Sequence, residues 1–192
     1  MKNTIIKVVL FIVIIVLAYF VVESFMKTVR FDKEQRRRSD VVIQSLKDIR
    51  SAQFSFKAIN GIYAHSFDTL IDFLKTGEIP VVKIIPDPED TTFTKTINDT
   101  IAFVLVKDSL FKHKGPNFKI EDLALIPFSD GEEFIMSAGE IEKGKVKVNV
   151  FEAIARKEIY LKGLNEELVS RESVSDLKVG SMTEPSTDGN WE

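Results

Sequence analysis

The residue types that most often carry catalysis are scattered in this chain. It has no cysteine and two histidines, His65 and His113, which lie far apart and have no second histidine at metal-binding spacing. Adjacent carboxylates such as Glu132 and Glu133 point in different directions on a regular element, which suits acid–base catalysis poorly. Phosphate-binding glycine loops and Gly-x-Ser-x-Gly elbows are also missing from the sequence. We therefore predict no enzyme, no metal site and no cofactor, and expect both histidines in surface or loop positions.

One acidic stretch could offer hard oxygen ligands to a calcium ion. It reads Asp87-Pro88-Glu89-Asp90. It lacks the Asp-x-Asp-x-Asp-Gly spacing of the twelve-residue calcium loop, so a solvated turn is the better interpretation.

Charge is distributed unevenly, although the net charge is only −3. Residues 1–22 carry +2, residues 23–60 carry nine Lys or Arg against five Asp or Glu and so +4, and residues 61–192 carry −9. A basic segment beside an acidic head suits a lipid surface, or the acidic surface of a neighbour, better than it suits nucleic acid. We expect this contact at Arg36, Arg37 and Arg38, while noting that basic residues are also common on solvated helices.

The element that must position these arginines is a single long helix. Residues 1–60 contain neither Gly nor Pro, and Gly61 then supplies a residue that can end a helix in the left-handed conformation. Such a helix would be roughly 80 Å long, against about 30 Å for the hydrocarbon core of a bilayer. About half of it must therefore stand in water or against protein.

The first third of this helix is predicted to be a membrane anchor. Residues 8–22 form an uninterrupted apolar run, and Lys7 can reach back to the headgroups. A cleaved signal peptide is the alternative, with Lys2 and Lys7 as its charged region and Val16-Leu17-Ala18 as its cleavage site. The apolar run continues past that site to residue 22, which favours a retained anchor.

The orientation of the anchor has two interpretations. Basic residues are more numerous after the span than before it, which by the positive-inside rule places the head in the cytoplasm. However, the three arginines begin near the limit of that rule's reach. A short basic N-terminus before an apolar run is also typical of signal anchors that export the C-terminal part of their chain. We favour an exported head.

A narrow apolar stripe on residues 23–60 predicts how this stem packs. The stripe has spacings of three or four and consists of Val42, Leu46, Ile49, Ala52, Phe56 and Ile59. This periodicity places it on one side of the helix, where docking on the chain's own head is the simplest explanation. A coiled-coil contact with another chain is the alternative, although about two heptads are few for one.

The head is predicted to be α+β, with one short helix and several strands. Ser66 can cap a helix that Gly77 ends. Residues 81–85 form a β-branched run closed by Pro86, and residues 100–106 form the most apolar strand, expected to be buried on both faces and covered by the stem. Residues 123–128 resemble a further strand, which Pro127 moves toward an edge.

The second part of the head predicts a hairpin. Residues 133–142 and 145–151 flank Lys143-Gly144, with Ser129-Asp130-Gly131 as a turn before them. Residues 153–164 are compatible with a strand or a short helix. For the polar tail, residues 170–192, we favour partial docking of a last strand; a recognition tag and disorder are the alternatives.

Residues 43–74 resemble the end of the long N-terminal helix of type IV pilins and type II secretion pseudopilins. The elements that carry the resemblance are aromatics at Phe54 and Phe56, an Asn60-Gly61-x-Tyr63 turn, and a short helix with Phe67, Leu70, Phe73 and Leu74. The prepilin processing site is missing, because no Gly precedes the apolar run and the first Glu is Glu23. The resemblance implies a long transmembrane-plus-stem helix packed on a small, mainly antiparallel sheet.

These observations predict a division into a transmembrane anchor (1–22), a basic amphipathic stem helix (23–60), an α+β head (61–169) and a polar tail (170–192). The expected function is that of a pilin-like structural or interaction subunit of an envelope-spanning assembly or secretion machine. It would be single-pass in the inner membrane, with a periplasmic head that binds other envelope or secretion-machine proteins and no nucleic acid. A homo-oligomer is left open. The alternative is a membrane-tethered ligand-binding or sensor domain.

Overall fold

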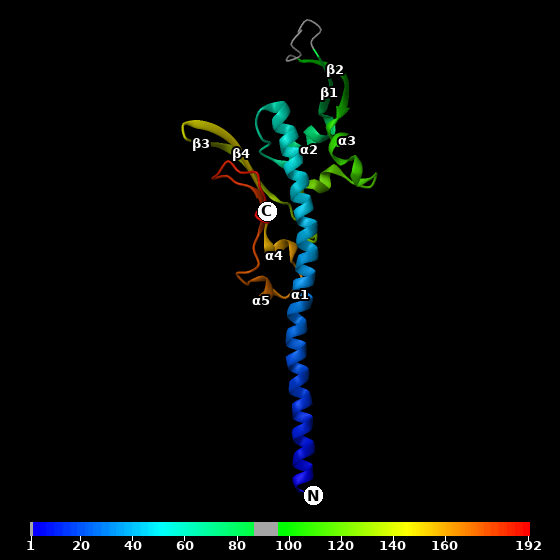
Figure 1. Ribbon diagram of the computed structural model, residues 1–192, viewed down its shortest axis with the longest axis vertical. Helices are drawn as coiled ribbons and strands as arrows, with labels where there is room; N and C mark the ends of the chain where they lie inside the picture. Colours follow the sequence, from blue (N-terminus) through cyan, green and yellow to red (C-terminus); the bar gives the residue numbers. More distant parts are fainter. Residues whose placement is uncertain (1, 87–95) are drawn as a thin grey trace.

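The long N-terminal helix is present as one unbroken element. The computed structural model describes residues 2–86 and 96–192, in which helix α1 spans Lys2–Asn60. The helix ends where Gly61 adopts a φ of 79° and its N–H donates to the carbonyl of Lys57 at 2.8 Å. Figure 1 shows the head gathered around the C-terminal half of α1, with the N-terminal half bare.

The head is built from short helices and two small antiparallel sheets, so the fold is α+β. Its strands are β1 (Glu78–Pro86), β2 (Thr96–Leu105), β3 (Ile135–Lys143), β4 (Val146–Ala155) and β5 (Leu177–Gly180). Its helices are α2 (Phe67–Thr76), α3 (Val106–Phe111), α4 (Lys157–Tyr160) and α5 (Glu166–Val169), with 3₁₀ helices η1 (Lys112–Lys114) and η2 (Ile120–Ala124).

The short helix α2 begins at the predicted cap. The hydroxyl of Ser66 accepts a hydrogen bond from the backbone N–H of Thr69, which satisfies one of the donors exposed at a helix start. Leu70 and Leu74, four residues apart, are fully buried. The predicted helix is therefore confirmed, and its apolar side joins the core.

A three-stranded sheet in the order β3-β4-β5 forms the larger part of the head. Its first two strands make the predicted hairpin, in which Lys143 pairs with Val146 across Gly144 and Lys145. Both turn residues have positive φ, 60° and 69°, as a two-residue turn that matches the strand twist requires. The hairpin prediction is confirmed, with the turn centred one residue later than expected.

The core lies where this sheet meets α1. Leu46 and Ile49 of α1, Phe151 of β4 and Val179 of β5 are all inaccessible to solvent. Tyr63, just after the helix, stacks on Phe151 with 4.7 Å between ring centroids. The stem helix thus supplies one wall of the head's own hydrophobic core.

A buried glutamine fixes the chain as it leaves α1. The side-chain amide of Gln53 donates to the carbonyl of Ala64 and accepts from its N–H, both at 2.9 Å. Gln53 is completely buried. Because these two bonds satisfy the backbone of Ala64 as a neighbouring strand would, they tie the turn at Gly61 to the side of the helix.

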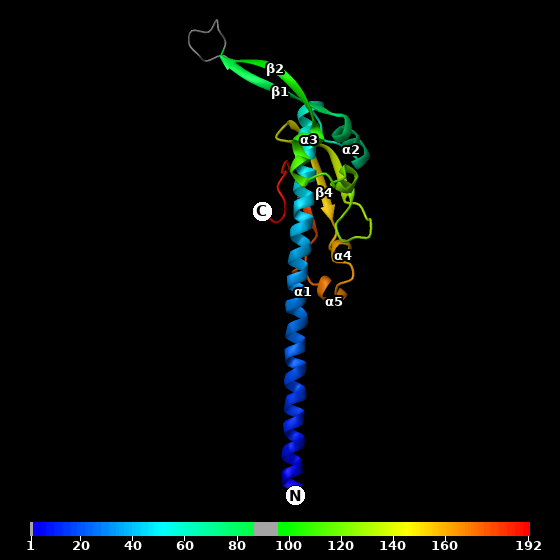
Figure 2. The same cartoon turned by 90° about the vertical axis from the view of Figure 1, so that its right-hand side faces the viewer.

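The expectation for residues 100–106 is wrong. They do not form a strand buried on both faces: β2 ends at Leu105, and Ile101, Phe103 and Val104 are exposed. β2 pairs with β1 alone, and this two-stranded arm extends away from the end of α1 (Figure 2). An uninterrupted apolar run does not distinguish a covered strand from one that lacks cover, because both leave the same pattern.

The prediction of a strand at residues 123–128 is also wrong. Its first residues belong to the 3₁₀ helix η2, and Leu125 makes an isolated bridge to Glu133. The following turn is as predicted, with Ser129 Oγ accepting from the N–H of Glu132 at 2.9 Å. Residues 153–164, left undecided, continue β4 to Ala155 and then form α4.

The polar tail contains the expected docked strand. β5 pairs antiparallel with β4, and Val174, Leu177 and Val179 are buried. The end of the chain returns to α1, where Arg50 donates to the carboxylate of Glu192 at 2.9 Å. The last residues therefore close over the sheet and the stem helix together.

Candidate interaction surfaces

The N-terminal part of α1 exposes an apolar surface on all sides. Every side chain in residues 6–22 is exposed, and Phe25, Met26 and Val29 extend apolar exposure beyond this run. Within the part of the chain that the structure describes, this helix is long and apolar enough to span a membrane. The first buried side chain described on α1 is Phe31, so burial of α1 side chains against the head begins there.

The apolar stripe of the stem faces the head. Val42, Leu46 and Ile49 are fully buried and Phe56 is 8% exposed, whereas Ile59, the last residue of the stripe, is exposed. Phe56 packs edge-on against Phe73 of α2, with ring centroids 5.1 Å apart. These positions are occupied by contacts within the chain.

Arg37 and Arg38 form one cluster with Glu34. Both guanidinium groups donate to the Glu34 carboxylate, at 2.6 Å from Arg37 and 3.0 Å from Arg38, and both lie over the ring of Phe128. The hydrogen bonds from Arg37 and Arg38 lower the pKa of Glu34 from its ordinary 4.5 to about 2, so the carboxylate stays charged at neutral pH.

Arg38 also joins the stem to the head. Its guanidinium donates to the backbone carbonyls of Tyr160 at 3.2 Å and Lys162 at 2.9 Å, and its side chain is only 16% exposed. The predicted contact set of Arg36, Arg37 and Arg38 is thus divided. Arg38 is engaged within the chain, Arg37 is more than half exposed, and Arg36 is exposed.

The arm formed by β1 and β2 is a second exposed apolar surface. Ile101 is 60% and Phe103 64% exposed, and Val81 on the partner strand is 38% exposed. The two strands pair only with each other, so each has one edge of unpaired backbone groups. A bulge between Val81 and Val82 interrupts the register. The sequence did not predict this surface, because only the tertiary structure decides whether another element covers β2.

A groove lies at the junction between α1 and the lowest part of the head. It has a volume of about 360 Å³, and its mostly apolar walls include Phe31 and Leu168. Lys27 and Arg30 of α1 also line it, facing Leu164 of the α4–α5 loop. We call it the base groove. Neither cation was singled out from the sequence, although their i, i+3 spacing places them together on one helix face.

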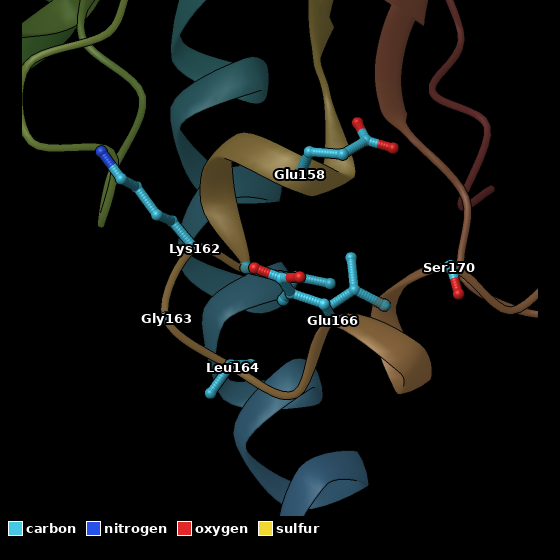
Figure 3. A pocket seen from close by; sticks show the side chains of 8 residues that line it. Glu158, Lys162, Gly163, Leu164, Glu166 and Ser170 are labelled. Atoms are coloured by element: carbon cyan, nitrogen blue, oxygen red, sulfur yellow. The ribbon is translucent and has the colours of Figure 1, made fainter.

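A second pocket shares the α4–α5 loop with the base groove. Its volume is about 320 Å³, and Figure 3 shows Glu158 and Glu166 among its lining side chains. Lys162 points away from both carboxylates and pairs with Asp130 at 3.2 Å. The pocket thus has two carboxylates and one lysine in its lining, and the ammonium of that lysine is paired with a residue outside the pocket.

Among residues 2–86 and 96–192, no cluster of His, Asp and Glu could hold a metal ion. The acidic stretch Asp87-Pro88-Glu89-Asp90 lies outside the described residues. His65 and His113 are both exposed, and His65 contacts the carbonyl of Ala138 at 3.0 Å.

Comparison of the chain with protein-family models, curated proteins and solved structures found no match. A functional assignment therefore depends on the geometry of this chain alone.

Proposed function

We propose that the chain is a membrane-anchored, pilin-like structural or interaction subunit of an envelope-spanning assembly or secretion machine. In this proposal α1 crosses the inner membrane once, the head lies on the periplasmic side, and its contacts with other envelope proteins are its function. The observation that carries the proposal is the presence of exposed apolar surface at both ends of the molecule, on the N-terminal half of α1 and on the arm.

The length of the bare helix supports the membrane assignment. Lys7 precedes the apolar run and Lys27 follows its extension to Met26, and these two cations are 20 positions apart, with Glu23 as the one charged residue between them. At about 1.5 Å per residue this spacing is roughly 30 Å, the thickness of the hydrocarbon core. The head, which buries α1 side chains from Phe31 onward, would then rest close to the membrane surface and leave no long free stem.

The arm supports the assignment of protein–protein contact. Contiguous exposed apolar side chains on a folded domain commonly mark interaction sites, and an isolated two-stranded hairpin is only marginally stable in water. A partner strand added to the free edge of β2 would satisfy backbone groups, and its side chains would pack beside Ile101 and Phe103 on the same face of the sheet. The arm lies at the far end of the molecule from the N-terminus, which suits a partner away from the bilayer (Figure 2).

Site-specific photocrosslinking in native membranes tests this function. A photoreactive phenylalanine analogue would replace Phe103 in the full-length, C-terminally tagged chain, and Val146, equally exposed at the other hairpin, would serve as the matched control. We expect adducts with identified envelope or secretion components from position 103 and not from position 146. Adducts from neither position, or equally from both, would refute the role of the arm.

Protease digestion of spheroplasts in the same preparation tests the orientation. An exported head is exposed and should be digested. A protected head, recovered without any partner, would place it in the cytoplasm and direct attention to the sensor alternative.

A further inference from the structure

The base groove combines cationic and apolar walls at one level of α1. Lys27 and Arg30 lie on its helix side, and Leu164 and Leu168 on its head side. Leu168 is 7% exposed and packs into the core, so the apolar wall is held in place by the fold. A site with this lining fits a ligand that carries both an anionic group and a hydrocarbon part.

The cations of the groove are available to an external ligand. Arg30 is 67% exposed and its described ion pair, to Glu23, is long at 3.9 Å. Lys27 is exposed and has no ion pair within the described part of the chain. Arg38, by contrast, is bound to backbone carbonyls of the head and cannot serve in this way.

The helix face that lines the groove continues onto the part of α1 that would lie in the bilayer. Phe20, Lys27 and Phe31 are seven and then four residues apart, so they share one face of the helix. Phe20 is 63% exposed. A hydrocarbon chain that starts at the groove can therefore follow this face toward the N-terminus while its headgroup stays beside Lys27.

We propose that the base groove binds an anionic phospholipid of the membrane that α1 spans. The lipid phosphate lies between Lys27 and Arg30, and the upper part of an acyl chain packs against Leu164 and along the face that carries Phe20. The bound lipid joins the head to the bilayer surface and so limits tilting of the head about its anchor. This proposal rests on the membrane anchoring in the proposed function, but not on the partner at the arm.

Native mass spectrometry of the full-length protein tests the site. The chain is released from detergent micelles that contain equal amounts of phosphatidylglycerol and phosphatidylcholine, and the retained lipids are counted. The test variant is Lys27→Gln/Arg30→Gln. The matched control is Lys33→Gln/Lys47→Gln, which removes the same charge from exposed positions of the same helix outside the groove.

We expect the wild type and the control variant to retain phosphatidylglycerol in preference to phosphatidylcholine. Each cation near an anionic lipid contributes about fivefold in affinity, so the test variant should lose roughly 25-fold. The proposal is overturned if the test variant retains phosphatidylglycerol like the wild type. It is also overturned if both double variants lose it equally, because the effect would then be one of general surface charge.

Carbonate washing of membranes from the same cells separates this outcome from failure of the proposed function. A chain that stays in washed membranes without lipid preference would refute the lipid site alone. A chain recovered in the soluble fraction would refute the anchoring on which both proposals depend.

Discussion

Gln53 and Glu34 show how single polar residues fix the stem helix against the head. Both lie on α1, but they act differently. Gln53 is fully buried and bonded to the backbone of one residue, Ala64. Glu34 is partly exposed and holds the side chains of Arg37 and Arg38. Replacing Gln53 should therefore lower the stability of the head, whereas replacing Glu34 should change how stability depends on pH.

Replacing Gln53 with Ala should destabilise the head by about 2–3 kcal/mol, because the N–H and carbonyl of Ala64 would be left buried without partners. Urea unfolding of the full-length protein in detergent measures this loss. Ser55→Ala is the control, since Ser55 bonds only to the carbonyl of Ser51 within the same helix. Similar unfolding midpoints for the two variants would show that the Gln53 bonds do not hold the turn.

The lowered pKa of Glu34 predicts that its contribution to the stability of the fold depends on pH. Because the folded pKa of Glu34 is lowered to about 2, its stabilising contribution is fully present above its ordinary pKa of 4.5 and is lost as the pH falls from there toward 2. The difference in Tm between wild type and Glu34→Gln should thus be largest near pH 7 and shrink across this interval. In an Arg37→Gln/Arg38→Gln background the same substitution should have little effect at any pH. A Tm difference that does not vary with pH would contradict the lowered pKa of Glu34.

At the scale of elements, two features that depend on neighbouring residues were predicted correctly, whereas two features that depend on contacts between distant parts of the chain were not. The capped helix α2 and the hairpin of β3 and β4 depend on residues next to one another, and both were predictable. The exposure of Ile101 and Phe103 was not, because it depends on whether another element covers β2. The same holds for the base groove, whose two sides are more than 130 residues apart in the sequence.

Gly180, at the end of β5, shows that close packing also constrains the backbone. Its φ is 76°, and a Cβ at this position would lie 2.2 Å from the carbonyl oxygen of Phe151. Gly180→Ala should therefore cost clearly more than Gly115→Ala, for which we expect about 1–2 kcal/mol from left-handed strain alone. Gly115 has a φ of 80° and nothing within 4 Å of its added Cβ. Equal losses of unfolding free energy for the two variants, measured in urea, would mean that β5 can move away from Phe151 without loss of stability.

At the scale of the whole molecule, the described side chains of the anchor lie outside the hydrophobic core of the head. The earliest buried side chain among those described on α1 is Phe31, so removal of residues 1–22 leaves the core complete. We expect the truncated chain to be soluble and to unfold at the same urea concentration as the full chain when both are measured in one detergent. A lowered midpoint would show that the anchor contributes to the fold of the head.

The sequence also left open whether the N-terminus is retained. The intact mass of the protein purified from membranes decides between the two interpretations, because cleavage after Ala18 would remove most of the apolar run. We expect the full mass. A shorter chain would instead make residues 1–18 a processed signal and leave only the apolar residues 19–22, followed by Phe25, Met26 and Val29, at the start of α1.

The way the arm leaves the head has a consequence for how this chain can change over evolutionary time. Its two strands start side by side, with Glu78 opposite Leu105, and the N–H of Val106 donates to the carbonyl of Gly77 at 2.9 Å. Ile79 still packs against the core, but the part of the arm beyond it can be shortened, lengthened or exchanged without moving the ends that the core must join. The root of the arm is thus a natural graft point, at which descendants of one scaffold can acquire new binding specificities and engineers can insert a foreign epitope.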